Sequence, residues 1–219
     1  MLIAEELVLA ALDPERGRPI NSSATVLPPC LCGALVAELA LSDLVRLEDR
    51  RFEAVGEPPP SGLLREVHQV LAAGKGRRAA AQLRRLDRQV GRAWARLVDG
   101  LVDQGVVGRD PRGWLQVTAF PLLRPDLRTE VVVRLQVAAA GSGPLEPRTA
   151  VLLSLVGPAR LLEVVADKPH AHAKRRIAEA TELTPVAEVV KKVIAEAASA
   201  AAAGAASAAA AGATSAGSG

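Results

Sequence analysis

Aromatic side chains are scarce in this chain of 219 residues. There are two Trp, two Phe and no Tyr, so aromatic residues make up 2% of the sequence. Proteins that bind single-stranded RNA or DNA ordinarily stack the bases on aromatic side chains, so the composition disfavours that class of function. The hydrophobic 49% rests mainly on Leu, Val and Ala, a composition typical of closely packed helices.

The sequence also lacks the motifs of catalysis and metal binding. It has no Gly-rich phosphate loop, no Gly-x-Ser-x-Gly turn and no His-Glu-x-x-His pair. Cys30 and Cys32 are too close for an easy disulfide, and no second Cys/His pair completes a metal set. Glu5 and Glu6 point in different helical directions, so we expect one to face solvent and the other to meet an arginine. We therefore expect a protein that is not an enzyme, without catalytic residues, cofactor or metal, whose two thiols are buried or half-buried and free.

Long apolar runs are missing too. The longest one, residues 150–166, is short and contains Pro158, Arg160 and Glu163. The chain starts with acidic residues where a signal peptide carries basic ones. We expect a cytoplasmic protein whose contact with a membrane is peripheral, on the inner face.

Hydrophobic periodicity and turn residues predict a mainly α fold, a single-domain helical bundle with two short β-hairpins. The helices are expected over residues 2–12, 31–42, 63–73, 77–103, 126–140, 147–167, 174–181 and 185–197. Pro158 should kink or split the sixth of them. The hairpins are expected to pair residues 44–47 with 51–55, and 106–107 with 114–117. Residues 198–219 hold only Ala, Gly, Ser and one Thr, so we expect a disordered tail beyond a domain of residues 1–197.

Basic residues are concentrated in one segment. Residues 75–96 contain eight basic side chains and one acid, Asp87, whereas the whole chain has a net charge of only +3. The segment carries Arg84, Arg88, Arg92 and Arg96, whose spacing of four places them within one arc of about 120° on a helix. On another side of the same helix lie apolar residues, namely Leu83, Leu86, Val90, Ala93, Leu97 and Leu101. This pattern indicates either a localised anionic partner or a solvated face whose arginines pair with the protein's own acids.

Three segments, in this order, resemble the Golgi phosphoprotein 3-like family. They are LIAEELVLAALD at Leu2–Asp13, GALVAELAL at Gly33–Leu41 and LVDGLVDQGVV at Leu97–Val107. Weaker matches are Leu63–Leu64, Arg148–Leu153 and Val186–Val190, so the resemblance covers residues 2 to about 197. The excess of Arg over Lys favours a bacterial member.

The resemblance implies a mostly helical, non-enzymatic peripheral membrane protein. Golgi members bind phosphatidylinositol 4-phosphate and hold the cytosolic tails of glycosyltransferases. Their second hairpin is an oligomer contact, which implies a homo-oligomer here through Val106, Val107, Trp114 and Val117. Trp114 itself is interpreted either as a core residue or as an exposed anchor, with the core preferred.

The family's lipid pocket uses one Trp and three Arg that this sequence does not match. The corresponding positions hold Ser23, Cys32, Gly91 and Trp94. The lipid species and any protein cargo therefore stay open, and Arg88, Arg92 or Arg96 is left to reach a phosphate from a shifted position.

The leading hypothesis is a peripheral adaptor that docks on anionic phospholipid headgroups through Arg84, Arg88, Arg92 and Arg96. In this hypothesis Val26 and Leu27 lie at a loop tip and insert shallowly into the membrane. One alternative is a winged-helix-like DNA binder, because a basic helix precedes a Gly-rich hairpin; few base-reading side chains on the helix make nucleic acid the weaker partner. The other alternative is a protein-interaction scaffold that binds no lipid.

Overall fold

The computed structural model describes residues 1–20, 25–74, 76–112, 117–167, 170–187, 189 and 192. The fold is mostly helical with two small antiparallel strand pairs, which confirms the expected class. The tail expected at residues 198–219 and most of the helix expected at 185–197 lie outside the described residues.

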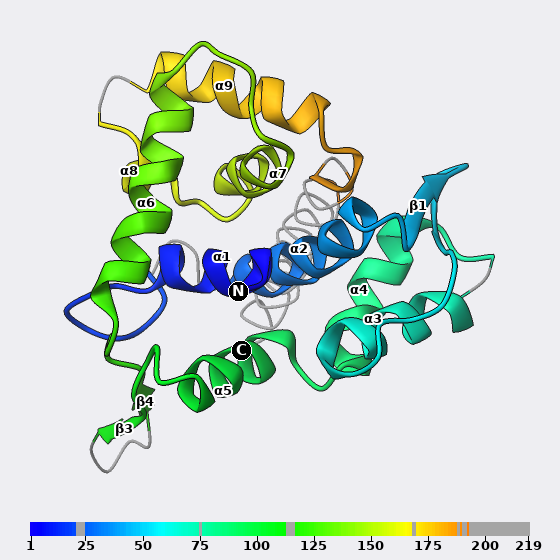
Figure 1. Cartoon of the computed structure of the whole chain (residues 1–219), viewed down its shortest axis with the longest axis horizontal. Coiled ribbons are helices and arrows are strands. Elements are labelled where there is room, and N and C mark those ends of the chain that lie inside the picture. Colours follow the sequence, from blue (N-terminus) through cyan, green and yellow to red (C-terminus); the bar gives the residue numbers. More distant parts are fainter. Residues whose placement is uncertain are drawn as a thin grey trace, which may run out of the picture.

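Helices α1 (Ile3–Ala11) and α2 (Leu27–Leu41) form the centre of the molecule (Figure 1). Every residue of α1 is buried, and α1 packs against α2, α5, α6 and α7. Helix α2 begins four residues before the sequence pattern indicated. Pro28 and Pro29 occupy its first turn, where proline is tolerated because the missing N–H would have no partner within the helix.

Two groups of helices flank this centre (Figure 1). On one side lie α6 (Pro125–Ala140), α7 (Pro147–Val156), α8 (Leu162–Val165) and α9 (Ala171–Glu182). The expected helix 147–167 is split into α7 and α8 around Pro158, as predicted. On the other side lie α3 (Gly62–Ala73), α4 (Ala79–Gln89) and α5 (Ala93–Asp103). Both groups pack on α1 or α2, so one hydrophobic core joins them.

The first hairpin is where the sequence predicted it. Strand β1 (Val45–Glu48) pairs with β2 (Arg51–Ala54), with Leu47 opposite Phe52. Val45 and Phe52 are buried against the core, so the hairpin is attached by one apolar face.

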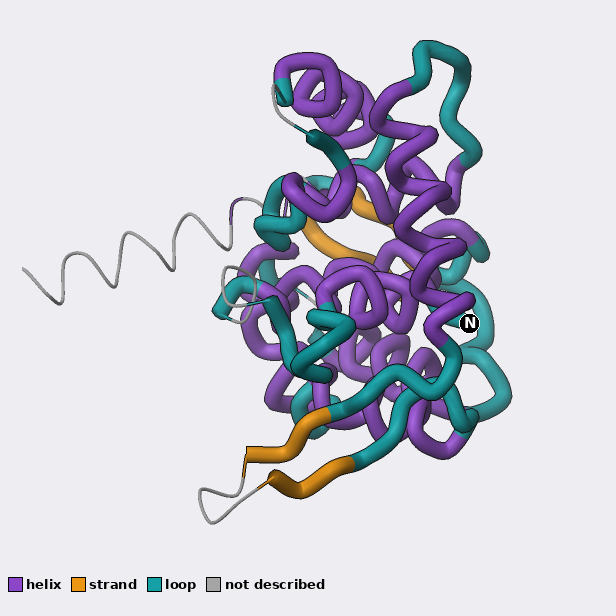
Figure 2. The backbone as a smooth tube through the Cα atoms, turned by 90° about the vertical axis from the view of Figure 1, so that its left-hand side faces the viewer, coloured by secondary structure: helices purple, strands orange, loops and turns teal. Residues whose placement is uncertain are grey.

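The second hairpin lies further along the chain than predicted. Strand β3 (Asp110–Arg112) pairs with β4 (Val117–Ala119), and the hairpin projects from the helical body (Figure 2). Val106 and Val107 are not part of it: both are buried, and Val107 bridges to Leu122. Their apolar side chains complete the core where α5 ends, which is why an apolar pair was mistaken for a hairpin strand.

Candidate anion-binding surface

The basic segment does not form the single helix that its spacing predicted. Helix α4 ends at Gln89 and α5 starts at Ala93, because Gly91 and Arg92 have φ angles of 75° and 66°. This left-handed conformation cannot continue a right-handed helix. The Asp87 side chain then accepts a hydrogen bond from the amide of Ala93 at 2.9 Å, which gives the first turn of α5 an acceptor. The predicted helix over residues 77–103 was therefore wrong at its middle, although the six side chains expected on its apolar side are all buried.

Most of the arginines are nevertheless exposed on α4 or beside its ends. Arg84, Arg85 and Arg88 occupy the solvent side of α4, within an arc of about 100°. Arg77 and Arg78 precede α4, and Arg92 follows it. We call the following set the α4 arginine surface: Arg77, Arg78, Arg84, Arg85, Arg88 and Arg92.

Few acidic side chains lie near the arginines of this surface among the described residues. Among the described residues, Arg77, Arg78, Arg85, Arg88 and Arg92 form no ion pair. Asp87, the acid of the segment, is committed to the amide of Ala93. The arginine side chains therefore present uncompensated positive charge to solvent.

Arg96 is separated from this surface. It donates to both carboxylate oxygens of Glu66, at 2.7 and 2.9 Å, and to the carbonyl oxygen of Val90 at 3.1 Å. The hydrogen bond from Arg96 holds the pKa of Glu66 below its ordinary value. The predicted arc of Arg84, Arg88, Arg92 and Arg96 was wrong in its last two members: Arg92 lies in the break after α4, and the guanidinium of Arg96 links α5 to α3.

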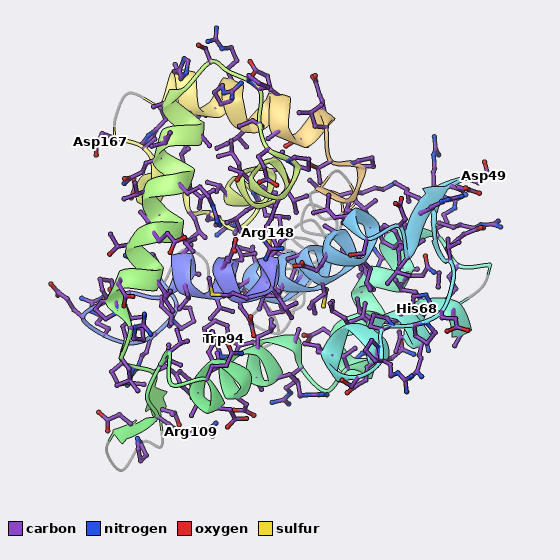
Figure 3. The ribbon with its side chains drawn as sticks, in the orientation of Figure 1. Asp49, His68, Trp94, Arg109, Arg148 and Asp167 are labelled. Carbon is purple, nitrogen blue, oxygen red and sulfur yellow. The ribbon has the colours of Figure 1, made fainter. Side chains whose placement is uncertain are left out.

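A pocket of about 360 Å³ lies at the break between α4 and α5. Asp87, Arg92 and Trp94 line it from this side, and Leu27 and Pro28 line it from α2. Trp94 lies on the side of α5 that faces the central helices (Figure 3) and packs edge-to-face on Phe120, with centroids 6.4 Å apart. We call this space the corner pocket. Of the family-equivalent positions, Trp94 lines this pocket, Gly91 lies in the adjoining break, Cys32 is fully buried and Ser23 lies outside the described residues.

Two further sets of predicted site residues are not exposed. Val26 and Leu27, expected at a membrane-inserting loop tip, are 7% and 1% exposed because α2 begins there. That expectation was wrong. Val106 and Val107, expected at an oligomer contact, are 5% and 0% exposed. Both side chains pack in the core, so they do not form a surface contact. Trp114 lies outside the described residues, and Val117 begins β4.

The sequence analysis missed a second group of arginines that contact acids in the interior. Arg148 donates to Glu38 at 2.7 Å and to Glu6 at 3.4 Å, and Arg134 also donates to Glu6. Glu38 in turn accepts from the amide of Ile3 at 2.6 Å. Figure 3 shows Arg148 between α7 and the central helices. We call Glu6, Glu38, Arg134 and Arg148 the buried ion-pair network after Glu6, which is buried, whereas the other three side chains are half-buried.

The network confirms that one of the two adjacent acids, Glu6, meets an arginine, but the expectation that the other faces solvent was wrong. Glu5 and Glu6 are both buried, at 7% and 4% exposure, so neither faces solvent. Glu5 accepts from the amide of Leu2 at 2.7 Å and from the side chain of Gln104 at 3.0 Å. The two carboxylates therefore connect α1 to different neighbours, and both serve to hold the fold together.

The two cysteines are free and buried, as predicted. Burial raises the pKa of the Cys30 thiol to about 12, which makes it a poor nucleophile. No cluster of three or more possible metal ligands occurs among the described residues.

The chain belongs to the Golgi phosphoprotein 3 (GPP34) family, whose sequence model matches residues 3–197. No curated protein matches the chain. Within the described ranges, no helix is both long enough and apolar enough to cross a membrane.

Proposed function

We propose that this protein is a non-enzymatic adaptor that docks on anionic phospholipid headgroups through the α4 arginine surface. The proposal is supported by five of these arginines that are exposed and form no ion pair among the described residues, namely Arg77, Arg78, Arg85, Arg88 and Arg92. Each basic side chain near an anionic bilayer contributes about 1 kcal/mol, so several together give reversible binding that weakens with salt.

The corner pocket supports a more specific role for Arg92. The family resemblance leads us to expect a headgroup site at this break, and Arg92 is the cation that lines it. In this proposal Arg92 contacts a headgroup phosphate, while Arg85 and Arg88 contribute the general attraction. In this proposal the protein docks from the cytoplasm on the inner membrane face. The β3–β4 hairpin contacts other copies of the chain, and the adaptor binds the tails of cargo proteins.

Co-sedimentation with vesicles tests the docking. We expect Arg88→Glu plus Arg92→Glu to abolish binding to phosphatidylcholine vesicles that contain phosphatidylinositol 4-phosphate or phosphatidylserine. The matched control is Arg124→Glu plus Arg175→Glu, which changes net charge equally at arginines that already have acidic partners, Asp126 and Glu179. Both double variants should keep the thermal unfolding midpoint of the unmodified protein, because exposed substitutions change stability by at most about 0.5 kcal/mol.

Equal recovery of the unmodified protein on anionic and neutral vesicles would refute the docking proposal. Loss of binding in both double variants would show attraction by net charge alone and would also contradict it. Salt-sensitive retardation of duplex DNA by the unmodified protein, without vesicle binding, would favour the DNA-binding alternative.

A further inference from the structure

We propose that a second pocket, at the N-terminal end of α4, binds a phosphate monoester carried on an apolar group. This space has a volume of about 850 Å³ and lies between the β1–β2 turn, the start of α4 and the chain after α9. We call it the α4 N-end pocket. Helix α4 is 11 residues long, so the pocket is separated from the corner pocket by the length of the helix, about 16 Å.

Charge in the α4 N-end pocket is strongly one-sided. Arginines come from two elements: Arg50 from the β1–β2 turn, and Arg77 and Arg78 from the segment before α4. Arg84 and Lys192 also line the space, and Glu182 is the acid among its lining residues. Among the described residues, Arg50, Arg77 and Arg78 form no ion pair, and three such arginines favour a ligand with more than one negative charge. Arginine side chains suit a phosphate because their N–H groups can bind two of its oxygens at once.

The backbone of α4 adds a donor to the same space. Arg78 at the N-cap provides no side-chain acceptor for the first turn. The amide of Ala79 donates to the carbonyl of Arg50 at 2.7 Å, and that of Ala81 donates to the carbonyl of Arg78 at 2.9 Å. The amide of Ala80 has no acceptor among the described residues. Because the first turn consists of alanines, an anion can approach this amide and the positive end of the helix dipole.

The remaining walls of the pocket are apolar apart from Thr181, whose hydroxyl donates to the carbonyl oxygen of Ile177. Leu47, Pro185 and Val189 line it together with the alanines of the first turn. The volume falls in the range of about 300–1,000 Å³ that small-molecule sites occupy, so a bare phosphate would leave most of the space empty. A phosphate monoester on an apolar group matches both the cationic side chains and these walls. Such a ligand is either a soluble phosphate ester or a membrane lipid whose headgroup ends in a monoester.

Substitutions of Ala80 test ligand binding without destabilising the fold. Ala80→Glu places a carboxylate where the phosphate is expected, yet a negative charge in the first turn stabilises a helix. Ala80→Gln has nearly the same size without the charge and is the matched control. In calorimetric titrations of the full chain with octyl phosphate, we expect Ala80→Glu to bind at least about tenfold more weakly than Ala80→Gln, with an unfolding midpoint at or above that of the unmodified protein. Inorganic phosphate should bind more weakly than octyl phosphate to the unmodified chain.

The source of the ligand follows from a second measurement on vesicles that contain phosphatidic acid. If Ala80→Glu reduces both octyl phosphate and vesicle binding, the ligand is a lipid; if it reduces octyl phosphate binding alone, the ligand is a soluble ester. Arg88 and Arg92 do not line the α4 N-end pocket, so Arg88→Glu plus Arg92→Glu should abolish vesicle docking but leave the difference in octyl phosphate affinity between Ala80→Glu and Ala80→Gln unchanged. Failure of this proposal and failure of membrane docking are thereby distinguished. Equal affinity of Ala80→Glu and Ala80→Gln, or no binding of octyl phosphate to the unmodified chain, would overturn the proposal.

Discussion

The buried ion-pair network and the α4 arginine surface use the same side chain in opposite ways. Arg148 is 28% exposed at its side chain and contacts Glu6, Glu38 and the carbonyl of Met1. Arg85, Arg88 and Arg92 are exposed and meet no acid among the described residues. Arginine content alone therefore says little about an anionic partner. The informative quantity is the number of arginines left over after the protein's own carboxylates have been assigned.

The largest effect is expected from breaking the network. Glu6→Gln removes a carboxylate that meets both Arg134 and Arg148, so it should lower the free energy of unfolding by about 3 kcal/mol. Chemical denaturation measures this change, with Glu57→Gln at an exposed acid as the control. A loss no larger than that of Glu57→Gln would show that the two groups of arginines are energetically alike.

A smaller effect is expected from removing the acid next to the α4 arginine surface. Asp87→Asn keeps an oxygen that can accept from Ala93 but removes the negative charge from the corner pocket. Binding to anionic vesicles should then strengthen by about 1 kcal/mol, or about fivefold. Asp103→Asn, the same charge change at an exposed position on α5, is the control. Equal gains in both variants would mean that the corner pocket has no special role.

The smallest effect on stability is expected for the pair of Arg96 and Glu66, which is paired like Arg148 but more exposed to solvent. Both side chains are about 40% exposed, so Glu66→Gln should lower the free energy of unfolding by only about 0.5 kcal/mol at neutral pH. Arg96 lowers the folded-state pKa of Glu66 below its ordinary value of 4.5, so this contribution is present above that pH and is lost as the pH falls below it. Unfolding curves of both proteins at several pH values measure the difference. A difference that grows on acidification would contradict this assignment.

Local patterns in the sequence predicted most of the fold. The first hairpin, the split at Pro158 and the helices α1, α3 and α6 follow from periodicity and from turn residues near their ends. The break in the basic segment was missed because Gly91 alone interrupts a long amphipathic pattern, and glycine is tolerated inside helices. Nothing before residue 91 indicates that Asp87 reaches forward to Ala93.

The candidate site was harder to predict because its character depends on distant partners. Glu6 meets Arg134 and Arg148, which lie 128 and 142 residues further along the chain. Likewise, the pairing of Arg96 with Glu66 spans 30 residues and removes one arginine from the predicted set. The α4 N-end pocket joins three segments that are far apart in the sequence. No spacing rule within one helix contains this information.

The positive φ of Arg92 sets the stability of the backbone against the charge of the corner pocket. A side chain other than glycine in that region raises the energy of the folded state by about 1 kcal/mol. Glycine at position 92 would relieve this strain, and Gly91 beside it shows that the turn accepts glycine. The same replacement would remove the guanidinium from the corner pocket, so backbone stability and positive charge in that pocket are opposed at this single residue.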